Sequence, residues 1–321
     1  MRMTKYVIKR VLLMLFVLFA VTTICFMLVR MLPREMPTDK VQKAQIEARW
    51  KALGYEEPLL TQYGIYLKNV FTEFDFGESW YIQFRKPALD LLTSRLLPTV
   101  LVNLYSLVFS IPVGILVGIY AAIKKNKWQD HVISTGVMVF VSVPSYVYAF
   151  LVQYILCFKL DLFPLAVLPL ADAGNSWFTS AMFHSMMPAV LAMSFGEIAG
   201  LCRFTRAELT ETLTSDYMLL ARTKGLTRAQ ATARHAMKNA MVPILPMIIG
   251  SFVSILSGSM IIEQIFSIPG VGRLYIQSIQ LFDYDVFMVD CIFYSFIGLL
   301  AGIVVDLSYG FIDPRIRMGE K

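Results

Sequence analysis

The sequence is poor in charged residues. Asp, Glu, Lys and Arg make up 16% of its 321 residues, hydrophobic residues make up 57%, and the mean hydropathy is +0.61. Soluble domains carry about 25% charged residues, so this chain has too little charge to cover the surface of a soluble protein of its length. The shortage excludes an ordinary soluble domain, and the surplus of apolar side chains is expected to face lipid.

Cysteine and histidine are also scarce. The four cysteines lie within or at the edge of apolar runs, without the spacing of a disulfide framework or a metal site. The three histidines neither cluster nor stand at metal-ligand spacing. We therefore expect no metal site and interpret the cysteines as small hydrophobic residues. These residues are Cys25, Cys157, Cys202 and Cys291, with His131, His184 and His235.

Motifs of nucleotide binding and hydrolysis are missing. The chain has no Gly-x-x-x-x-Gly-Lys-Ser/Thr loop to cradle phosphates, so any ATP-driven work is expected on separate subunits. It also lacks Gly-x-Ser-x-Gly and His-Glu-x-x-His, which makes an intramembrane hydrolase a poor hypothesis. We expect the chain to hold no cofactor of its own and not to be an enzyme.

Long apolar runs dominate what is present. Because a helix needs about 20 residues to cross the hydrocarbon of a bilayer, six runs predict an all-α membrane protein with about six transmembrane helices. Four runs are free of charge, one carries Glu197 and one carries Asp290. The runs are Val11–Val29, Val100–Ile123, Val132–Phe158, Phe183–Cys202, Met241–Ile262 and Val286–Val305.

Two local features qualify these spans. The first run could be a secretory signal peptide, but it ends in Val29-Arg30-Met31-Leu32-Pro33 without a small-residue cleavage site, which favours a retained helix. Pro112 and Pro144 fall inside predicted spans and are expected to kink them.

Lysine and arginine gather in alternate loops. Short cytoplasmic loops retain these residues, so the pattern predicts that both ends of the chain lie in the cytoplasm. We attribute the net charge of +6 to this topology and to contact with anionic lipid, and we expect no nucleic-acid binding. The basic groups lie at residues 2–10, 124–127, 203–238 and 315–321.

The spans divide the chain into residues 1–31 with the first helix, a long external loop at 32–98, and a five-helix core at 99–321. Within the external loop, Asp39–Leu53 has helical periodicity and Gly54 is placed to end that helix, while Asp75–Ser79 is turn-like. Aromatic side chains here would be costly to leave in water, which favours a small ordered cap over a disordered loop. They are Trp50, Phe71, Phe74, Phe76, Trp80 and Tyr81.

The internal loop at residues 203–240 is basic and amphipathic. Its pattern predicts helices over Asp216–Thr223 and Thr227–Asn239, the second with Thr227 as its N-cap. Gly225 at the bend permits a positive φ and a close approach of backbones. A helix–glycine–helix bend suits the docking of a soluble partner, although basic surface helices also lie at lipid interfaces.

At this loop the sequence resembles a known family, the inner-membrane permease subunits of binding-protein-dependent ABC importers, and within it the oligopeptide/dipeptide (and nickel) branch. Members carry a cytoplasmic coupling helix with a Glu-Ala-Ala…Gly signature. In Asp216–Leu226, Ala221 and Gly225 match that signature, whereas Leu219 and Leu220 replace its Glu and first Ala. The Asp-Tyr…Ala-Arg-x-Lys-Gly-Leu form of the branch is matched closely.

Further fragments resemble the same branch in order along nearly the whole chain. They are Leu53-Gly54, Pro58-Leu59, Gln62-Tyr63, Asp75-Phe76-Gly77, Arg95–Thr99, Ser142–Ser145, Arg234–Ala240, Glu263–Gly272, Val305–Tyr309 and Asp313–Arg317. The chain departs from the branch at Pro33–Pro37, Asp285 and Asp290. Those departures lie on the external side, so they put contacts with substrate or binding protein in doubt rather than the coupling machinery.

The resemblance implies a mechanism. The bend would insert into a groove of a soluble ATPase, whose closure would rock the spans between inward-open and outward-open states. The implied coupling residues are Asp216, Tyr217, Ala221, Arg222, Lys224, Gly225 and Arg228. For the cations among them, retention of positive charge on the cytoplasmic side is an equally good explanation.

The resemblance also implies the partners. They are a second homologous permease subunit, two ATP-binding subunits that hold ATP and Mg, an extracytoplasmic substrate-binding protein, and a peptide substrate. The branch also handles nickel chelates and other small solutes. The expected location is the cytoplasmic membrane of a bacterium or archaeon.

Two carboxylates in or beside the spans are candidate pathway or gate residues. Glu197 lies within a span, where a charge is expensive and marks function by default, but a pair with a basic neighbour at the interface is as good an interpretation. Glu263 ends the fifth span before a Ser-Ile-Pro-Gly-Val-Gly turn, and we favour a gate over plain solvation. The candidates in that turn are Pro269, Gly270 and Gly272.

Two other functions remain open. An ion-driven secondary transporter predicts charged residues near the bilayer midplane, and the midspan regions here are almost free of charge. A non-transporting membrane assembly subunit would keep the same topology and docking loop.

Overall fold

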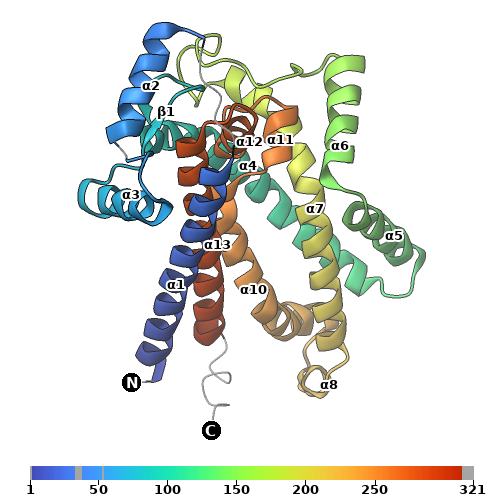
Figure 1. Cartoon of the computed structure of the whole chain (residues 1–321). Coiled ribbons are helices and arrows are strands. Elements are labelled where there is room, and N and C mark those ends of the chain that lie inside the picture. Colours follow the sequence, from blue (N-terminus) through green and yellow to red (C-terminus); the bar gives the residue numbers. More distant parts are fainter. Residues whose placement is uncertain (1, 33–37, 53, 313–321) are drawn as a thin grey trace. The chain divides into compact units, whose positions relative to one another are not determined.

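The computed structural model describes residues 2–32, 38–52 and 54–312, and in these ranges the chain is mostly helical (Figure 1). The predicted motif at Asp313–Arg317, the departure at Pro33–Pro37 and the end of the predicted helix at Leu53 lie outside the described residues.

Five helical stretches in the described part are long and apolar enough to cross a membrane. The number rises to six if one bent pair of helices counts as a single broken span: α5, and α6 with its continuation η1, which are apolar enough together and bent by 103°. The prediction of an all-α protein with about six transmembrane helices is confirmed. The elements concerned are α1 (Arg2–Met31), α4 (Ala88–Ile123), α5 (Trp128–Ser142), α6 (Ser145–Val152), η1 (Gln153–Lys159), α7 (Ser180–Leu213), α9 (Arg228–Ala231), η2 (Thr232–Ala236), α10 (Met237–Val253), η3 (Ser254–Ser257) and α13 (Tyr284–Ile312).

The third predicted span, Val132–Phe158, is not one helix with a kink. It breaks between α5 and α6, where Val143 is extended with φ −82° and ψ 130° and Pro144 follows with φ −57° and ψ 140°. Proline has no N–H to give to the preceding turn, and its ring pushes the residue before it out of the helical region. The result is a break rather than the expected kink. The other predicted kink falls within α4, which runs through Pro112 as one helix.

The fifth predicted span, Met241–Ile262, is displaced toward the N-terminus. Its helix starts at Arg228 and ends at Ser257, and Gly258 follows with φ 61°. The short helix α11 (Met260–Ile265) is a separate element. The second helix predicted for the internal loop and the fifth span are therefore successive parts of one helical stretch.

The chain forms two compact units, each with its own cores. One unit contains residues 1–99, 257–260 and 269–300, and the other contains residues 100–256, 261–268 and 301–321. In the first, buried side chains of α4 pack with α12 (Val271–Gln280) and α13, and side chains of α1 pack with α3 (Leu59–Glu73) and α13. In the second, α4, α6 and α7 share a core with α11, and the C-terminal ends of α4 and α7 share another with α8 (Asp216–Thr223), α9 and α10.

The segment predicted as a cap is folded. The predicted helix Asp39–Leu53 is α2 (Lys40–Ala52), and Asp39 Oδ1 accepts a hydrogen bond from the Val41 N–H at 2.7 Å. The side chain of Arg49 donates to Asp75 Oδ2 at 2.8 Å. Burial lowers the pKa of Arg49, but this hydrogen bond and the charge of Asp75 outweigh it and raise the pKa above its ordinary value.

A two-stranded hairpin follows α3. Strand β1 (Glu78–Ser79) pairs antiparallel with β2 (Lys86–Pro87), and the turn between them is held by the buried carboxylate of Asp283, which is 1% exposed. Asp283 accepts hydrogen bonds from Ser79 Oγ at 2.6 Å and from the N–H groups of residues 80, 81 and 82 at 3.1–3.2 Å. Asp285, one of the departures from the branch, accepts from the Glu78 N–H at 3.3 Å.

The expectation that the aromatic side chains of this segment are sheltered holds only in part. Trp50 stacks on Tyr55 with ring centroids 5.5 Å apart. Phe71 and Phe74, however, are 73% and 75% exposed. The reason is that α3 turns its other face, with Tyr63 and its neighbours, toward α1.

Candidate functional site

In the coupling segment predicted at residues 203–240, residues 203–213 continue α7, and the remainder forms a helical bend that leads into α10 (Figure 1). The first helix, α8, has the predicted bounds Asp216–Thr223. Thr227 caps the second, because Thr227 Oγ1 accepts from the Gln230 N–H at 3.3 Å and Gln230 Oε1 accepts from the Thr227 N–H at 3.1 Å. Such a reciprocal pair satisfies two backbone donors at a helix start.

Gly225 turns the chain between the two helices. Its φ is 90°, a conformation that side chains with a Cβ rarely adopt. Its N–H donates to Arg222 O at 3.0 Å, and the Leu226 N–H donates to Ala221 O at 3.3 Å. A Cβ at Gly225 would meet no described atom within 4 Å. The predicted positive φ is confirmed. Within this chain a glycine is needed at position 225 because of its backbone conformation, since a Cβ would have room there.

One face of α8 belongs to a core. Met218 and Ala221 are 3% and 6% exposed and pack among residues from α4, α7, α9, η2 and α10. Several of these residues are alanines, whose small side chains let the helices approach closely. Ala221, a predicted coupling residue, thus faces the protein interior. The other buried members are Ala122, Leu209, Ala231, Ala236 and Ala240.

The other face of α8 is exposed and carries apolar residues. Tyr217, Leu219 and Leu220 are 39%, 65% and 55% exposed. The remaining predicted coupling residues are exposed with them: Asp216, Arg222, Lys224, Gly225 and Arg228. Sequence reasoning noted Leu219 and Leu220 only as departures from a signature. Leu219 and Leu220 stand between the buried positions Met218 and Ala221. This sequence pattern could have predicted that the exposed face of α8 is apolar.

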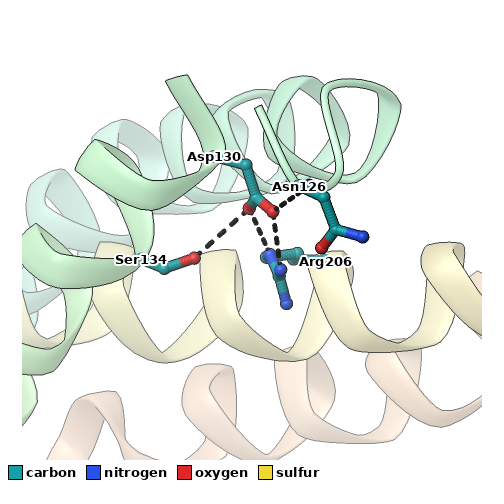
Figure 2. Close-up of polar contacts among 4 residues, drawn as sticks. All are labelled: Asn126, Asp130, Ser134 and Arg206. Carbon is teal, nitrogen blue, oxygen red and sulfur yellow. Dashed lines mark hydrogen bonds and ion pairs between the residues drawn. The ribbon is translucent and has the colours of Figure 1, made fainter. Parts of the chain in front are cut away.

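A buried ion pair lies in the same unit (Figure 2). Asp130, near the start of α5, is 1% exposed, and Arg206 of α7 donates to its two carboxylate oxygens from Nε at 2.5 Å and from Nη2 at 2.7 Å. The same carboxylate accepts from the Asn126 N–H at 2.9 Å and from Ser134 Oγ at 3.3 Å. One carboxylate therefore ties together the turn before α5, the first turns of α5 and the C-terminal half of α7.

Sequence reasoning missed this pair. Arg206 was counted only among the basic residues of its loop, and Asp130 was not singled out. A partial signal existed, because Asp130 stands two residues before the charge-free run that begins at Val132. Its partner is 76 residues away in the sequence and follows only from the packing of α5 on α7.

Two glycines of α4 set its distance from α7. A Cβ at Gly114 would come within 2.8 Å of Leu201 Cβ, and a Cβ at Gly118 within 2.7 Å of Thr205 Cβ and 2.8 Å of the backbone oxygen of Cys202. Small residues four positions apart let helix backbones touch in this way. Thus α7 is held by α4 on one side and by Asp130 of α5 on another, just before the chain reaches α8.

Within the part of the chain that the structure describes, Glu197 pairs with a serine and not with a basic neighbour. Its Oε1 accepts a hydrogen bond from Ser251 Oγ of α10 at 2.8 Å, and in the described part of the chain its carboxylate forms no ion pair. Arg203 instead lies over the ring of Phe204, 5.2 Å from its centroid. The interpretation of Glu197 as half of an interfacial ion pair is wrong for the described chain.

Glu263 and the candidate residues of the turn that follows it, from Pro269 on, belong to different units. Glu263, in α11, is 2% exposed, which rules out plain solvation within this chain, and its backbone oxygen accepts from the Ile268 N–H at 2.9 Å. Gly270 precedes α12, whose first residue, Val271, donates its N–H to Thr99 Oγ1 at 2.9 Å. The other candidates of the turn are Pro269 and Gly272.

Comparisons with known proteins cover the chain nearly end to end. Residues 114–318 match the family described as binding-protein-dependent transport system inner membrane component, and residues 3–89 match the N-terminal part of such membrane components. The chain is 34% identical to the dipeptide transport system permease protein of Lactococcus lactis subsp. cremoris over 98% of this chain and 100% of the relative. It is 32% identical to the dipeptide permease protein of Bacillus subtilis over 99% of this chain and 100% of the relative, and 32% identical to the glutathione transport system permease protein of Escherichia coli K12 over 98% of this chain and 99% of the relative.

These matches agree with the apolar spans and with the helical bend beyond α7. The chain is a multi-pass protein of the cytoplasmic membrane, and it belongs to the family of binding-protein-dependent transport system inner membrane components, the permease subunits of ABC importers.

Proposed function

We propose that the chain is one of two permease subunits of an ATP-driven importer of short peptides. Family membership supports the transport role and favours it over an ion-driven transporter or an assembly subunit. The relatives named above are permease proteins for dipeptides and for glutathione, which supports a substrate of two or three residues. In this proposal the chain is non-catalytic and holds no cofactor, and ATP and Mg bind to two partner subunits.

The observation that carries the proposal is the division of α8 into two faces. Met218 and Ala221 anchor one face in the core, while Leu219 and Leu220 leave an apolar patch exposed on the other. An exposed apolar patch bordered by charge is typical of a protein–protein contact. We assign it to the groove of a soluble ATP-binding subunit, with Arg222, Lys224 and Arg228 placed to pair with carboxylates of that partner.

Rigid contacts behind α8 would carry its motion into the spans. The core that holds Met218 also contains residues of α4, α7 and α10. Gly118 fixes the distance between α4 and α7, and Asp130 with Arg206 fixes α5 to α7. A displacement of α8 by the ATPase would therefore move four span-forming helices together, namely α4, α5, α7 and α10, because packed interiors transmit strain rather than absorb it.

The orientation in the membrane and the remaining partners are proposed from the distribution of basic residues and from family membership. Both chain ends and α8 lie in the cytoplasm, and an extracytoplasmic binding protein delivers the peptide to the opposite side. The second permease completes the pathway. The proposed pathway or gate residues are Glu197, Glu263, Pro269, Gly270 and Gly272.

The test is ATPase activity of the reconstituted transporter with its binding protein. A dipeptide, glutathione and a free amino acid are compared as stimulants, and stimulation by one of the peptides alone is expected. Leu220→Asp is expected to abolish both the stimulation and the recovery of the ATP-binding subunits with the permease. Ala233→Asp adds the same charge at another exposed position and serves as the matched control. Full stimulation and assembly with Leu220→Asp would contradict the proposed docking face.

A further inference from the structure

Helix α3 carries an exposed apolar stripe that the proposed transport mechanism does not use. Leu60 and Phe71 are 77% and 73% exposed, and Phe74 at the end of the helix is 75% exposed. At the angular spacing of an α-helix, positions 60, 64 and 71 fall within about 40° of one another, so they form one line along the helix. Gly64 and Lys68, which lie in and beside that line, are also exposed.

A neighbouring face of α3, with Tyr63 and Tyr66, is fastened to α1. The hydroxyl groups of Tyr63 and Thr23 are hydrogen-bonded at 2.5 Å, and the rings of Tyr63 and Tyr66 each lie 5.1 Å from the ring of Phe26. Tyr63 is 8% exposed and Phe26 is 2% exposed. These contacts fix the side of α3 that faces the protein and leave the Leu60–Phe71 line facing outward.

The same contacts fix the depth of α3. The stretch of α1 that is long and apolar enough to span a membrane is Lys5–Met31, and Phe26 lies five residues before the end of that stretch. At 1.5 Å per residue that is about 8 Å along the helix. Interfacial helices bury their apolar face about 5–10 Å into the boundary between headgroups and acyl chains. A helix fastened beside Thr23 and Phe26 is therefore at the depth of that boundary.

The lipid-facing surface of α1 continues to this level. Ile24 and Leu28 are 58% and 59% exposed; Ile24 lies between Thr23 and Phe26, the two positions that hold α3, and Leu28 follows them. We propose that α3 lies in the plane of the membrane interface at the C-terminal end of α1, with Leu60, Phe71 and Phe74 among the lipid chains. Lys68, beside the apolar line, extends its ammonium group to the lipid phosphates, as long basic side chains do at this level. The partner is the bilayer itself, and the inference requires only that α1 spans it.

Nitroxide labels on the full-length chain in phosphatidylcholine/phosphatidylglycerol vesicles test this placement. The four native cysteines are replaced by alanine, and single labels are attached through Leu60→Cys and Phe71→Cys, which probe the two ends of the stripe independently. Phe16→Cys on α1, 68% exposed, is the lipid reference, and Val41→Cys on α2, 66% exposed, is the water reference. Collision rates with oxygen and with a water-soluble nickel chelate are measured at each position.

At positions 60 and 71 the ratio of oxygen to nickel collisions is expected to be several-fold higher than at position 41 and to approach the ratio at position 16. A ratio equal to that at position 41 would show that the stripe faces water and would overturn the proposal. Low collision rates with both reagents would show that protein covers the stripe, and they would overturn it equally.

Discussion

The guanidinium of Arg206 on α7 donates two hydrogen bonds to the carboxylate of Asp130 on α5, across 76 residues of sequence. Asp130 is almost fully buried, and its charge is matched by this arginine together with the Asn126 N–H and the Ser134 hydroxyl. A buried carboxylate in this position is tolerable only while its partners stay in place. The pair therefore makes the junction of α5 and α7 sensitive to either residue.

Replacing Arg206 with alanine leaves the Asp130 carboxylate buried without its cation. We expect a loss of about 3 kcal/mol in stability, since breaking one side of a buried pair costs about 3–5 kcal/mol and Arg206 is partly exposed. The measurement is thermal unfolding of the purified chain in detergent. Arg203→Ala, which removes an arginine from the same helix, is expected to leave the transition nearly unchanged.

A double variant separates the burial of charge from the loss of packing. Asp130→Asn combined with Arg206→Gln removes both charges, so it is expected to be more stable than Arg206→Ala alone. If the double variant unfolds at a lower temperature than the single one, the unpaired charge is not the cause of the defect.

Variants of Gly225 distinguish conformation from contact. With φ at 90°, Gly225→Val is strained by about 1–2 kcal/mol or more, so we expect it to uncouple ATP hydrolysis from peptide uptake. Gly225→Asn should retain much more coupling, because asparagine tolerates positive φ better than β-branched residues. The measurement is the ratio of peptide transported to ATP hydrolysed in proteoliposomes. If both variants lose coupling to the same extent, Gly225 is needed for contact with the ATPase rather than for its backbone conformation.

Gly118 is expected to be intolerant of any side chain. Gly118→Ala would place a Cβ within 2.8 Å of the backbone of α7 at Cys202, and the resulting overpacking should cost about 1–3 kcal/mol. Gly200→Ala is the matched control on α7, because a Cβ there meets no described atom within 4 Å and alanine favours the helix by about 1 kcal/mol. Thermal unfolding of both variants in detergent measures the difference. A lower transition temperature for Gly200→Ala than for Gly118→Ala would refute this account of the α4–α7 contact.

Asp283→Ala is expected to loosen the hairpin turn at residues 79–82. The variant removes the acceptor of the Ser79 hydroxyl and of three backbone N–H groups, and hydrogen bonds to a charged group contribute about 1.5–3 kcal/mol each. Hydrogen exchange of the amides of residues 80–82 should accelerate, while the amides of α2 stay protected. Unchanged exchange at residues 80–82 would show that the strand pairing alone holds the turn.

The amino-acid sequence by itself determined the features that depend on neighbouring residues. Apolar length predicted the membrane spans, because a helix must remain apolar for the thickness of the bilayer. The bounds Asp216–Thr223, the N-cap at Thr227 and the positive φ at Gly225 were also predicted, since capping and left-handed backbone depend on residue types within a few positions. The family resemblance followed from short motifs of the same local kind.

Tertiary structure alone decided the features that join distant segments. The partner of Asp130, the capping of the turn at Ser79 by Asp283, and the approach of Gly118 to α7 all depend on how helices dock. The 103° angle between the helices on either side of Pro144 could not be predicted from the sequence either. A proline can produce a small bend in a helix or end the helix completely. Sequence fixes the strength of each local preference, whereas the energy of packing and of buried charge depends on atoms brought together only by the fold.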